Sequence, residues 1–319
     1  MPMKLDSKIF LAGHSGLVGS AIGRGLKRGG YRHVVGHDEH TLDLTSPVAT
    51  LKFFERDRPE YVFLAAAKVG GILANNTYPA DFIRVNLQIE VNVVDACFRT
   101  GVKKLLFLGS SCIYPKLAQQ PLREDSFLTG VLEPTNDAYA VAKIAGIMLC
   151  KSYNRQHGTN YIAAMPTNLY GPGDNFDLET SHVLPAMIRK FHEAKRDGKN
   201  SVELWGTGTP RRELLYVDDL ADALVYLMNN YDVTDATRAQ FPFVNVGVGT
   251  DQTIAELAEL VRRVVGYQGE IAWNRDMPDG TPQKLLDVSK LHAMGWRAQT
   301  SLEQGVRQTY QWYLENRAS

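Results

Sequence analysis

Short apolar runs alternate with longer amphipathic stretches in the first half of the sequence, and this alternation constrains the fold more than any other feature. Runs of strand length lie at residues 8–12, 34–35, 61–67, 104–110 and 161–165. Helical patterns lie between them, at residues 17–28, 47–56, 79–100 and 137–157. Strands that alternate with helices pack as a parallel sheet between two layers of helices. The pattern therefore predicts an α/β fold with a doubly wound parallel sheet.

The pattern becomes less regular after Asn168. Turn-rich stretches lie at residues 170–174 and 205–210, and the later elements are mixed. We expect helices at residues 182–197, 217–230, 253–265 and 301–315, and a strand at 243–247. These elements predict a smaller mixed α/β domain for the substrate. The first domain should span residues 1–167 plus about 213–247, and the second 168–212 plus about 248–319.

Charge and composition exclude several classes of protein. Lys plus Arg equals Asp plus Glu at 35 each, without a basic block, which argues against nucleic acid as a partner. The N-terminus has no secretory signal, and no stretch reaches the roughly 20 apolar residues of a membrane helix. Three scattered cysteines (Cys97, Cys112 and Cys150) suit neither a disulfide framework nor a metal site. We expect a cytoplasmic protein with reduced thiols and no metal.

A glycine-rich loop follows the first predicted strand and precedes the first predicted helix. It consists of Gly13, His14, Ser15, Gly16, Leu17, Val18 and Gly19. Glycines there permit a tight turn, a close approach of backbone amides to a pyrophosphate, and close packing of helix on strand. A plain turn is the alternative interpretation. In this context the loop predicts a Rossmann-type domain that binds a nicotinamide dinucleotide.

The residues that would select the cofactor follow the second strand. An acidic residue about 20 positions beyond the glycines often binds a ribose hydroxyl and favours NAD. Here Asp38 and Glu39 occupy this region beside His37, although they suit solvated loop charges equally well. Asp43 is better placed to reach the adenine edge.

The predicted catalytic residues come from one strand end and one helix. Tyr139 and Lys143 are four residues apart, so they lie one turn apart on the same helix face. An ammonium there stabilises the phenolate, lowers its pKa from about 10, and can hold the nicotinamide ribose. Ser110 at the end of a predicted strand can orient a substrate oxygen. An exposed helix pair is the alternative, but with the glycine loop the combination indicates a reductase.

Two further residues suggest proton transfer in addition to reduction. Cys112 lies two residues after Ser110, hence on the same side if the chain there is extended. A nearby positive group would make its thiol a base. His182 begins a predicted helix, where it could enter the cleft. A buried apolar role for Cys112 and a surface position for His182 are the alternatives.

Matching segments through nearly the whole chain then indicate a family. They are residues 64–72, 74–82, 106–116, 132–136, 165–172, 181–182 and 278–287. In these segments the chain resembles the GDP-L-fucose synthase family of extended short-chain dehydrogenases/reductases. The resemblance implies a bifunctional 3,5-epimerase and 4-reductase that acts on GDP-4-keto-6-deoxy-D-mannose.

The resemblance also implies residue roles. Ser110, Tyr139 and Lys143 would act in the reduction, and Cys112 and His182 would be base and acid at sugar C3 and C5. The nicotinamide side would be lined by Leu108, Gly109, Ser110, Ser111, Pro166, Thr167, Asn168, Leu169 and His182. The substrate would be bound by Lys190, Trp205, Arg212 and Asp279. A solvated helix charge and a core aromatic are the alternatives for Lys190 and Trp205.

The implied cofactor is NADPH, with one departure from the family. Relatives often carry arginine in the glycine loop and again after the second strand, to hold the 2′-phosphate. Here those regions show Ser15 and the sequence from His37 to Glu39, so NADH stays open. Relatives usually form dimers through two helices each, and residues 79–100 and 137–157 are the candidates for a homodimer.

Two other functions fit parts of the pattern. The nearest alternative function is that of another nucleotide-sugar epimerase or dehydratase, but a dehydratase needs acidic groups at the positions that Ser111 and Cys112 occupy here. A non-catalytic NADP-sensing protein of the same fold can lose the tyrosine or lysine, whereas Tyr139 and Lys143 are both present.

Overall fold

The computed structural model describes residues 2–277 and 279–318, so Pro278 of the last matching segment lies outside the described residues. The main sheet has six strands in the order β10-β5-β4-β3-β1-β2, and every pair in it is parallel. These strands are β1 (Lys8–Ala12), β2 (His33–Val35), β3 (Tyr61–Leu64), β4 (Lys104–Leu108), β5 (Tyr161–Pro166) and β10 (Phe243–Val246). The predicted α/β fold with a parallel, doubly wound sheet is confirmed.

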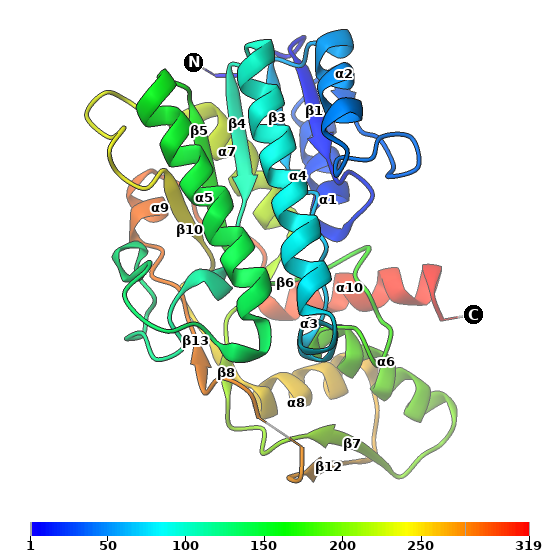
Figure 1. The fold of residues 1–319 in the computed structure, drawn as a ribbon. Helices are drawn as coiled ribbons and strands as arrows, with labels where there is room; N and C mark the ends of the chain where they lie inside the picture. The colour runs from blue at the N-terminus through cyan, green and yellow to red at the C-terminus, as the bar shows by residue number, and fades with distance from the viewer. Residues whose placement is uncertain (1, 278, 319) are drawn as a thin grey trace.

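Helices cover both faces of this sheet, as Figure 1 shows. One layer contains α2 (Pro47–Asp57), α4 (Pro79–Thr100) and α5 (Asp137–His157), and the other contains α1 (Leu17–Arg28) and α7 (Val217–Asn230). Alternate strand residues point into the two layers and form two separate hydrophobic cores. The sheet buries both faces, which is why its strands are nearly continuous apolar runs in the sequence.

Local chemistry explains how the longest helices end and pack. Gly101 ends α4 in the left-handed region, with φ of 75°, as its position in the sequence suggests. Gly146 lets α5 approach the sheet, since a Cβ there would lie 2.3 Å from the Phe107 ring on β4. This close approach brings the N-terminal turns of α5 to the carboxyl end of β4.

A smaller part lies below the carboxyl ends of the main strands (Figure 1). Its helices are α6 (Val183–Arg196), α8 (Ile254–Val265) and α10 (Leu302–Asn316), which surround a third hydrophobic core. Its strands are β6 (Asn168–Tyr170), β7 (Ser201–Trp205), β8 (Arg211–Arg212), β9 (Leu214–Tyr216), β11 (Gln252–Thr253), β12 (Glu270–Asn274) and β13 (Gln283–Lys284). They form the pairs β12-β7 and β6-β9 and the three-stranded sheet β11-β8-β13.

The structure differs from the sequence-based expectation in several elements. Strands β3 and β4 end earlier than predicted, at Leu64 and Leu108, because the chain turns into loops of the cleft. The short helices α3 (Ile72–Thr77) and α9 (Ser289–Ala293) and most strands of the smaller part were not predicted. Elements of two to six residues are too short to show a hydrophobic period.

The last quarter of the chain returns partly to the main sheet. Leu286 and Val288 pack into one of its cores, and Leu291 and Trp296 pack into the other. These contacts fix the segment that follows β13 against the two cores of the main sheet. Within residues 2–277 and 279–318, no helix combines the length and apolar character needed to cross a bilayer.

Candidate active site

Most of the predicted cofactor-binding residues lie at the carboxyl ends of β1, β4 and β5. In a parallel sheet these ends share one edge, and in Figure 1 that edge faces the smaller part. The glycine loop follows β1, the Ser110 turn follows β4, and Thr167 follows β5. The fold therefore brings together segments that are more than 150 residues apart in the sequence.

The glycine loop has the shape that a dinucleotide needs. Gly13 has φ of 82°, and a Cβ there would lie 2.7 Å from the Ala66 amide nitrogen. A Cβ at Gly19 would lie 1.9 Å from the Gly13 carbonyl oxygen, so both positions require glycine. Gly16 is the N-cap of α1, and no side chain among the described residues caps this helix end. The free helix N-terminus and open glycine surface fit a pyrophosphate.

The loop after β2 lies against the glycine loop. The His14 ring covers Gly36, where a Cβ would lie 2.4 Å from His14 Cγ. His14 Nε2 is 3.7 Å from a carboxylate oxygen of Asp38, and the Asp38 side chain is largely exposed. Asp43 lies in the loop before α2, where one carboxylate oxygen accepts hydrogen bonds from the Thr45 amide and hydroxyl at 2.8 and 2.6 Å. Asp38 thus stands nearest to the glycine loop.

The strand-end serine and the cysteine are joined by a turn. Ser110 is extended, but residues Ser111–Ile113 form a single 3₁₀ turn. The conditional prediction of an extended chain at Cys112 is therefore wrong. The Cys112 amide donates a hydrogen bond to Ser110 Oγ at 3.4 Å, and the Ser110 hydroxyl lies near enough to lower the pKa of the Cys112 thiol and of the Tyr139 phenol. Ser110 and Cys112 are therefore brought together by this turn, and not by the alternation of side chains along an extended strand.

Helix α5 supplies Tyr139 and Lys143 on one face, as predicted. The Lys143 ammonium lies 5.8 Å from the centre of the Tyr139 ring and 4.7 Å from that of Phe107. Its side chain is 2 % exposed and pairs with Glu90 of α4, at 3.3 Å. The alternative of an exposed helix pair is thereby excluded for Lys143.

Burial dominates the acid–base chemistry of this cluster. Desolvation raises the pKa of Tyr139 well above its usual value, Cys112 and Glu90 add to this rise, and Ser110 opposes it. Burial likewise raises the pKa of the Cys112 thiol, and the ammonium of Lys284 gives the largest opposing effect. Lys284 is thus a positive neighbour of Cys112, but burial outweighs it and the pKa of the thiol stays above its usual value.

His182 is the N-cap of α6 rather than its first helical residue. The residue is exposed at the surface, yet desolvation by its neighbours lowers the pKa of His182, and the Lys284 ammonium lowers it further. The loop before α3 supports this segment, since a Cβ at Gly71 would lie 3.2 Å from the Thr180 carbonyl oxygen. Cys112 and His182 thus share Lys284 as a charged neighbour.

The proposed nicotinamide side is closely packed. Gly109 follows β4, and a Cβ there would lie 2.2 Å from the Met165 methyl. Thr167 and Asn168 both donate hydrogen bonds to the Glu213 carbonyl, at 3.2 and 3.1 Å. Leu108, Asn168 and Leu169 are half-buried, whereas Ser111, Pro166 and Thr167 are buried. These contacts hold the ends of β4 and β5 in place beside Ser110.

The four predicted substrate residues lie in the smaller part and are connected. Lys190 Nζ donates to the Glu203 carbonyl at 3.0 Å and lies 5.8 Å from the Trp205 ring centre. Trp205 is 55 % exposed, so it is no core aromatic. Asp279 accepts hydrogen bonds from the Thr207 amide and hydroxyl at 2.7 and 2.8 Å, directly after Trp205. Lys190 and Trp205 thus form one open wall.

Arg212 links this wall to the cysteine. Burial lowers the pKa of Arg212, while the nearby Asp279 opposes this shift. Arg212 and Lys284 are opposite one another in the parallel β8–β13 pair. Two half-buried cations in register make a local site for an anion such as a diphosphate.

Sequence reasoning missed two residues that organise the site. Lys284 lies within a segment that resembled the family, but only the β8–β13 register shows that it faces Arg212. Glu213 is fully buried and accepts hydrogen bonds from the amides of Val248, Gly249 and Leu286, at 2.6, 2.7 and 2.9 Å. Glu213 thereby ties the two halves together, a role without any sequence signal.

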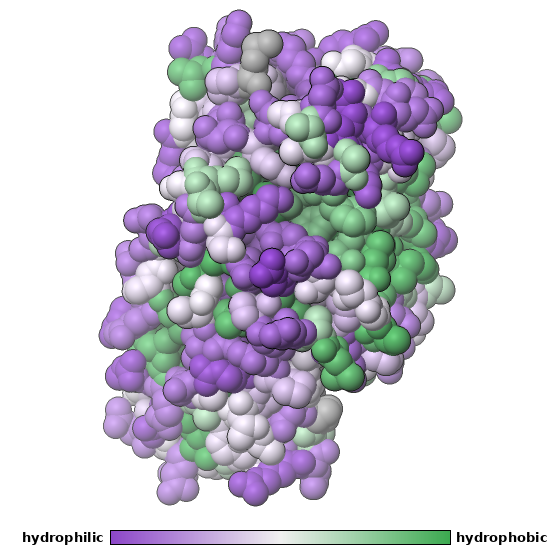
Figure 2. All heavy atoms as spheres, turned by 90° about the vertical axis from the view of Figure 1, so that its left-hand side faces the viewer, coloured by the Kyte–Doolittle hydropathy of each residue, from purple (hydrophilic) through white to green (hydrophobic). Residues whose placement is uncertain are grey.

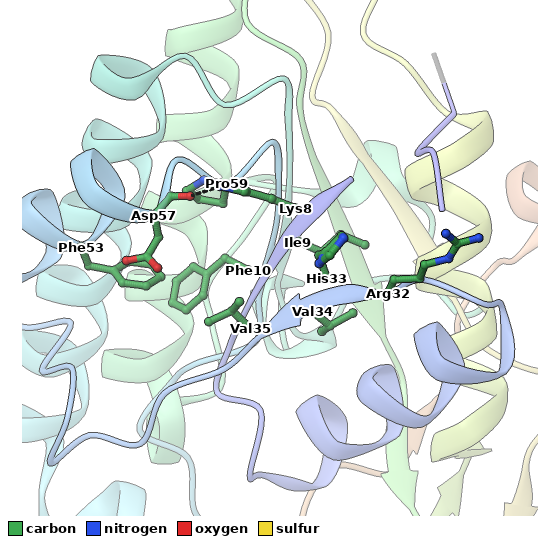
Figure 3. A pocket seen from close by; sticks show the side chains of 10 residues that line it. All are labelled: Lys8, Ile9, Phe10, Arg32, His33, Val34, Val35, Phe53, Asp57 and Pro59. Atoms are coloured by element: carbon green, nitrogen blue, oxygen red, sulfur yellow. Dashed lines mark hydrogen bonds between the residues drawn. The ribbon is translucent and has the colours of Figure 1, made fainter. Parts of the chain in front are cut away.

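A separate hollow lies at the edge of the main sheet, and Figure 3 shows its lining from β1, β2 and α2. Lys8, Arg32 and His33 border it, and Phe10 and Phe53 form its apolar side. None of the predicted site residues lines it. Within the described chain, no group of three His, Cys, Asp or Glu side chains could hold a metal ion.

Comparisons with known proteins agree with this geometry. Residues 9–247 match the family model described as the NAD dependent epimerase/dehydratase family. The chain is 57% identical to GDP-L-fucose synthase 1 of Arabidopsis thaliana, over 98% of this chain and 94% of that protein. It is 53% identical to GDP-L-fucose synthase of Escherichia coli, over 97% of each. A GDP-L-fucose synthetase structure from Naegleria fowleri bound to NADP shows a TM-score of 0.90, with 28% identity, over 99% of this chain and 96% of that one.

The family match covers the segments that carry the glycine loop, Ser110, Tyr139 and Arg212, and the relatives extend the similarity to the later segment with Lys284. The chain therefore belongs to the NAD dependent epimerase/dehydratase family and, within it, to the GDP-L-fucose synthases.

Proposed function

We propose that this chain converts GDP-4-keto-6-deoxy-D-mannose to GDP-L-fucose, by 3,5-epimerisation and 4-reduction with a nicotinamide reductant. The observation that carries the proposal is the place of the Ser110 hydroxyl, which lies close enough to the Tyr139 phenol and to the Cys112 thiol to lower the pKa of both. One side chain thus lies beside the proposed proton donor of the reduction and the proposed base of the epimerisation. The named relatives support the same pair of reactions.

The reduction needs a proton at the sugar C4 oxygen. Tyr139 is the donor, because burial keeps its phenol protonated and Ser110 can hold the same substrate oxygen. Lys143 stands beside the phenol and compensates the charge that forms when the proton leaves. A bound nicotinamide supplies the hydride to C4. Reduction therefore rests on Ser110, Tyr139 and Lys143.

The epimerisation needs a base and an acid at C3 and C5. The C4 ketone acidifies the protons on both neighbouring carbons, so one base can act at each in turn. The Cys112 thiolate would remove the proton, supported by the Lys284 ammonium, and His182 would return a proton to the opposite face. The proton leaves from one face of the carbon and the new proton arrives on the opposite face, so the configuration of that carbon is inverted.

The GDP part of the substrate suits the smaller part of the molecule. Arg212 and Lys284 would meet the diphosphate, and Trp205 with Lys190 would form the wall beyond it. Asp279 orients the turn between them through Thr207.

We propose residues 168–212 plus about 248–319 as the substrate domain, and residues 1–167 plus about 213–247 as the dinucleotide domain. Residues near 286–296 return to the cores of the latter.

NADPH is the proposed reductant, in line with the NADP in the Naegleria fowleri structure. The glycine cradle at Gly13 and Gly19 fits the pyrophosphate of either dinucleotide. The 2′-phosphate would approach Ser15 and the His14–Asp38 pair. With no arginine in these two loops, NADH also fits.

A homodimer through α4 and α5 is proposed as the assembled form. Both helices leave large apolar side chains exposed, with Val91 and Phe98 on α4 and Val141 and Met148 on α5. Figure 2 shows hydrophobic side chains gathered on its right-hand side. This side of Figure 2 corresponds to the front of the molecule in Figure 1. A continuous apolar face of this kind suits a symmetric four-helix contact.

We propose the cytoplasm as the location, because Cys112 can act as a base only while its thiol stays reduced. The three cysteines, Cys97, Cys112 and Cys150, are all free and buried.

A direct assay tests the main proposal. Purified protein is mixed with GDP-4-keto-6-deoxy-D-mannose and either NADPH or NADH, and the loss of reductant absorbance is followed. We expect turnover with the wild type and a loss of at least 100-fold in Tyr139→Phe. Absence of turnover with both reductants would refute the proposal.

A further inference from the structure

Glu90 lies in the middle of α4 and faces α5 rather than solvent. Its side chain is 1 % exposed, and one carboxylate oxygen is 3.3 Å from the Lys143 ammonium, which is 2 % exposed. Among the described residues neither carboxylate oxygen has a hydrogen-bond partner besides that ammonium. A fully buried carboxylate with a single cationic partner costs free energy that an uncharged side chain would avoid.

The partner of Glu90 is the proposed catalytic lysine. The same ammonium lies 5.8 Å from the Tyr139 ring centre, so Glu90, Lys143 and Tyr139 form one buried electrostatic unit. The carboxylate of Glu90 raises the pKa of Tyr139, and this effect ranks behind those of burial and Cys112. The charge of Glu90 therefore reaches the phenol despite its position on a different helix.

Burial raises the pKa of Glu90 to about 7, against the opposing effect of Lys143. Three ionisable groups of α5 interact with it: Lys143, Tyr139, and Cys150, whose pKa Glu90 also raises. The Glu90–Lys143 pair thus has two charge states near neutral pH. With Glu90 ionised the pair is neutral, and with Glu90 protonated it carries one positive charge.

We propose that Glu90 is a positioning residue for the reduction, which fixes the Lys143 ammonium beside Tyr139 and sets how strongly that ammonium favours the phenolate. This inference rests on the proposed function. An ionised Glu90 offsets the lysine charge and keeps Tyr139 protonated as the proton donor. Without the carboxylate, the lysine charge is unopposed and Tyr139 loses its proton more readily.

The test uses Glu90→Gln, which keeps the shape of the side chain and removes its charge. The matched control is Glu60→Gln, which breaks an ion pair with Lys103 outside the cleft. For each protein, the ultraviolet absorbance of ionised tyrosine is titrated with alkali and compared with the same protein carrying Tyr139→Phe. The difference isolates the Tyr139 phenol and requires neither cofactor nor substrate.

We expect a larger ratio of Tyr139 phenolate to phenol in Glu90→Gln at each alkaline pH, by about tenfold for each unit of pKa change. Glu60→Gln should match the wild type. Equal phenolate fractions in Glu90→Gln and wild type would overturn the inference. If Glu90→Gln does not fold, Glu90→Asp replaces it. This variant withdraws the carboxylate from Lys143 by one methylene, so the Tyr139 titration should shift in the same direction. An unshifted titration in Glu90→Asp would overturn the inference.

The pH profile of reductant oxidation gives a second readout. We expect an inflection near pH 7 in wild type that is absent in Glu90→Gln, and an alkaline limb that moves to lower pH. A buried residue with a structural role alone would change turnover equally at all pH values. Should the keto sugar prove not to be a substrate, the absorbance titration still decides the role of Glu90 independently.

Discussion

Ser110 Oγ accepts a hydrogen bond from the Cys112 backbone amide at 3.4 Å, and the same hydroxyl lowers the pKa of the Cys112 thiol. This arrangement arises from the 3₁₀ turn at Ser111–Ile113, which follows β4. The turn holds the proposed base of the epimerisation against the serine that we propose to orient the ketone of the reduction. In this proposal the two reactions use one strand end, and changing one side chain should separate them.

Cys112→Ser should abolish proton exchange at C3 and C5 and keep the reduction site intact. A serine hydroxyl is a far weaker base than a thiol, so exchange should fall by at least 100-fold. Incorporation of solvent deuterium into the sugar measures the exchange, and reductant binding reports on the rest of the site. Cys150→Ala, a buried cysteine of α5 that the mechanism does not use, is the control. Unchanged deuterium incorporation in Cys112→Ser would exclude the role of Cys112.

Lys284→Met should raise the pKa of the Cys112 thiol further, because Lys284 gives the largest effect that opposes burial. Exchange at neutral pH should then fall by about tenfold for each unit of pKa change, and its pH profile should move to higher pH. Deuterium exchange as a function of pH measures this shift. Lys190→Met serves as the comparison, since Lys190 lies beside Trp205, and it should weaken substrate binding without moving the profile.

Ser15→Arg should increase the preference for NADP over NAD. The variant places a guanidinium in the glycine loop near the Asp38 side of the ribose site, where it can pair with a 2′-phosphate. We expect the ratio of the two dissociation constants to change by at least about tenfold, the equivalent of roughly 1.4 kcal/mol. Titration of tryptophan fluorescence with each oxidised dinucleotide measures the ratio without any turnover. An unchanged ratio would show that the 2′-position lies elsewhere.

Asp174→Asn should change how stability depends on pH. Burial raises the pKa of Asp174 to about 7, and the Asn175 amide only partly opposes this shift. Because the folded-state pKa is raised, the contribution of Asp174 is fully present below about pH 4 and is lost as the pH rises through 7. The wild type should lose about 4 kcal/mol relative to Asp174→Asn over this range. Urea unfolding at several pH values tests it, and a constant difference between the two proteins would contradict the prediction.

Much of the fold could be predicted because it depends on local patterns. Strand β1, helix α1 and the glycines between them follow from short-range periodicity and from backbone conformations that only glycine adopts. Helices α4, α5 and α7 were predicted with their observed bounds, since each is long and carries an apolar stripe. The spacing of Tyr139 and Lys143 likewise needs only the helical repeat.

The parts that could not be predicted depend on contacts between distant segments. Strand β13 has two residues, and Lys284 becomes a partner of Cys112 only because β13 pairs with β8 beside Arg212. Glu213 shows no motif, yet it binds three amides of segments that follow β10 and β13. The turn at Cys112 also replaced the expected extended chain, because a few residues at a strand end carry no period.

The sequence by itself therefore determined the class of fold, the dinucleotide cradle and the tyrosine–lysine pair, because each is encoded within one helix or one loop. The tertiary structure alone decided which charges surround these groups. Glu90 comes to Lys143 from a neighbouring helix, and Lys284 comes to Cys112 from the far end of the chain. Electrostatic energies depend on distance and burial, and the linear order of residues specifies neither.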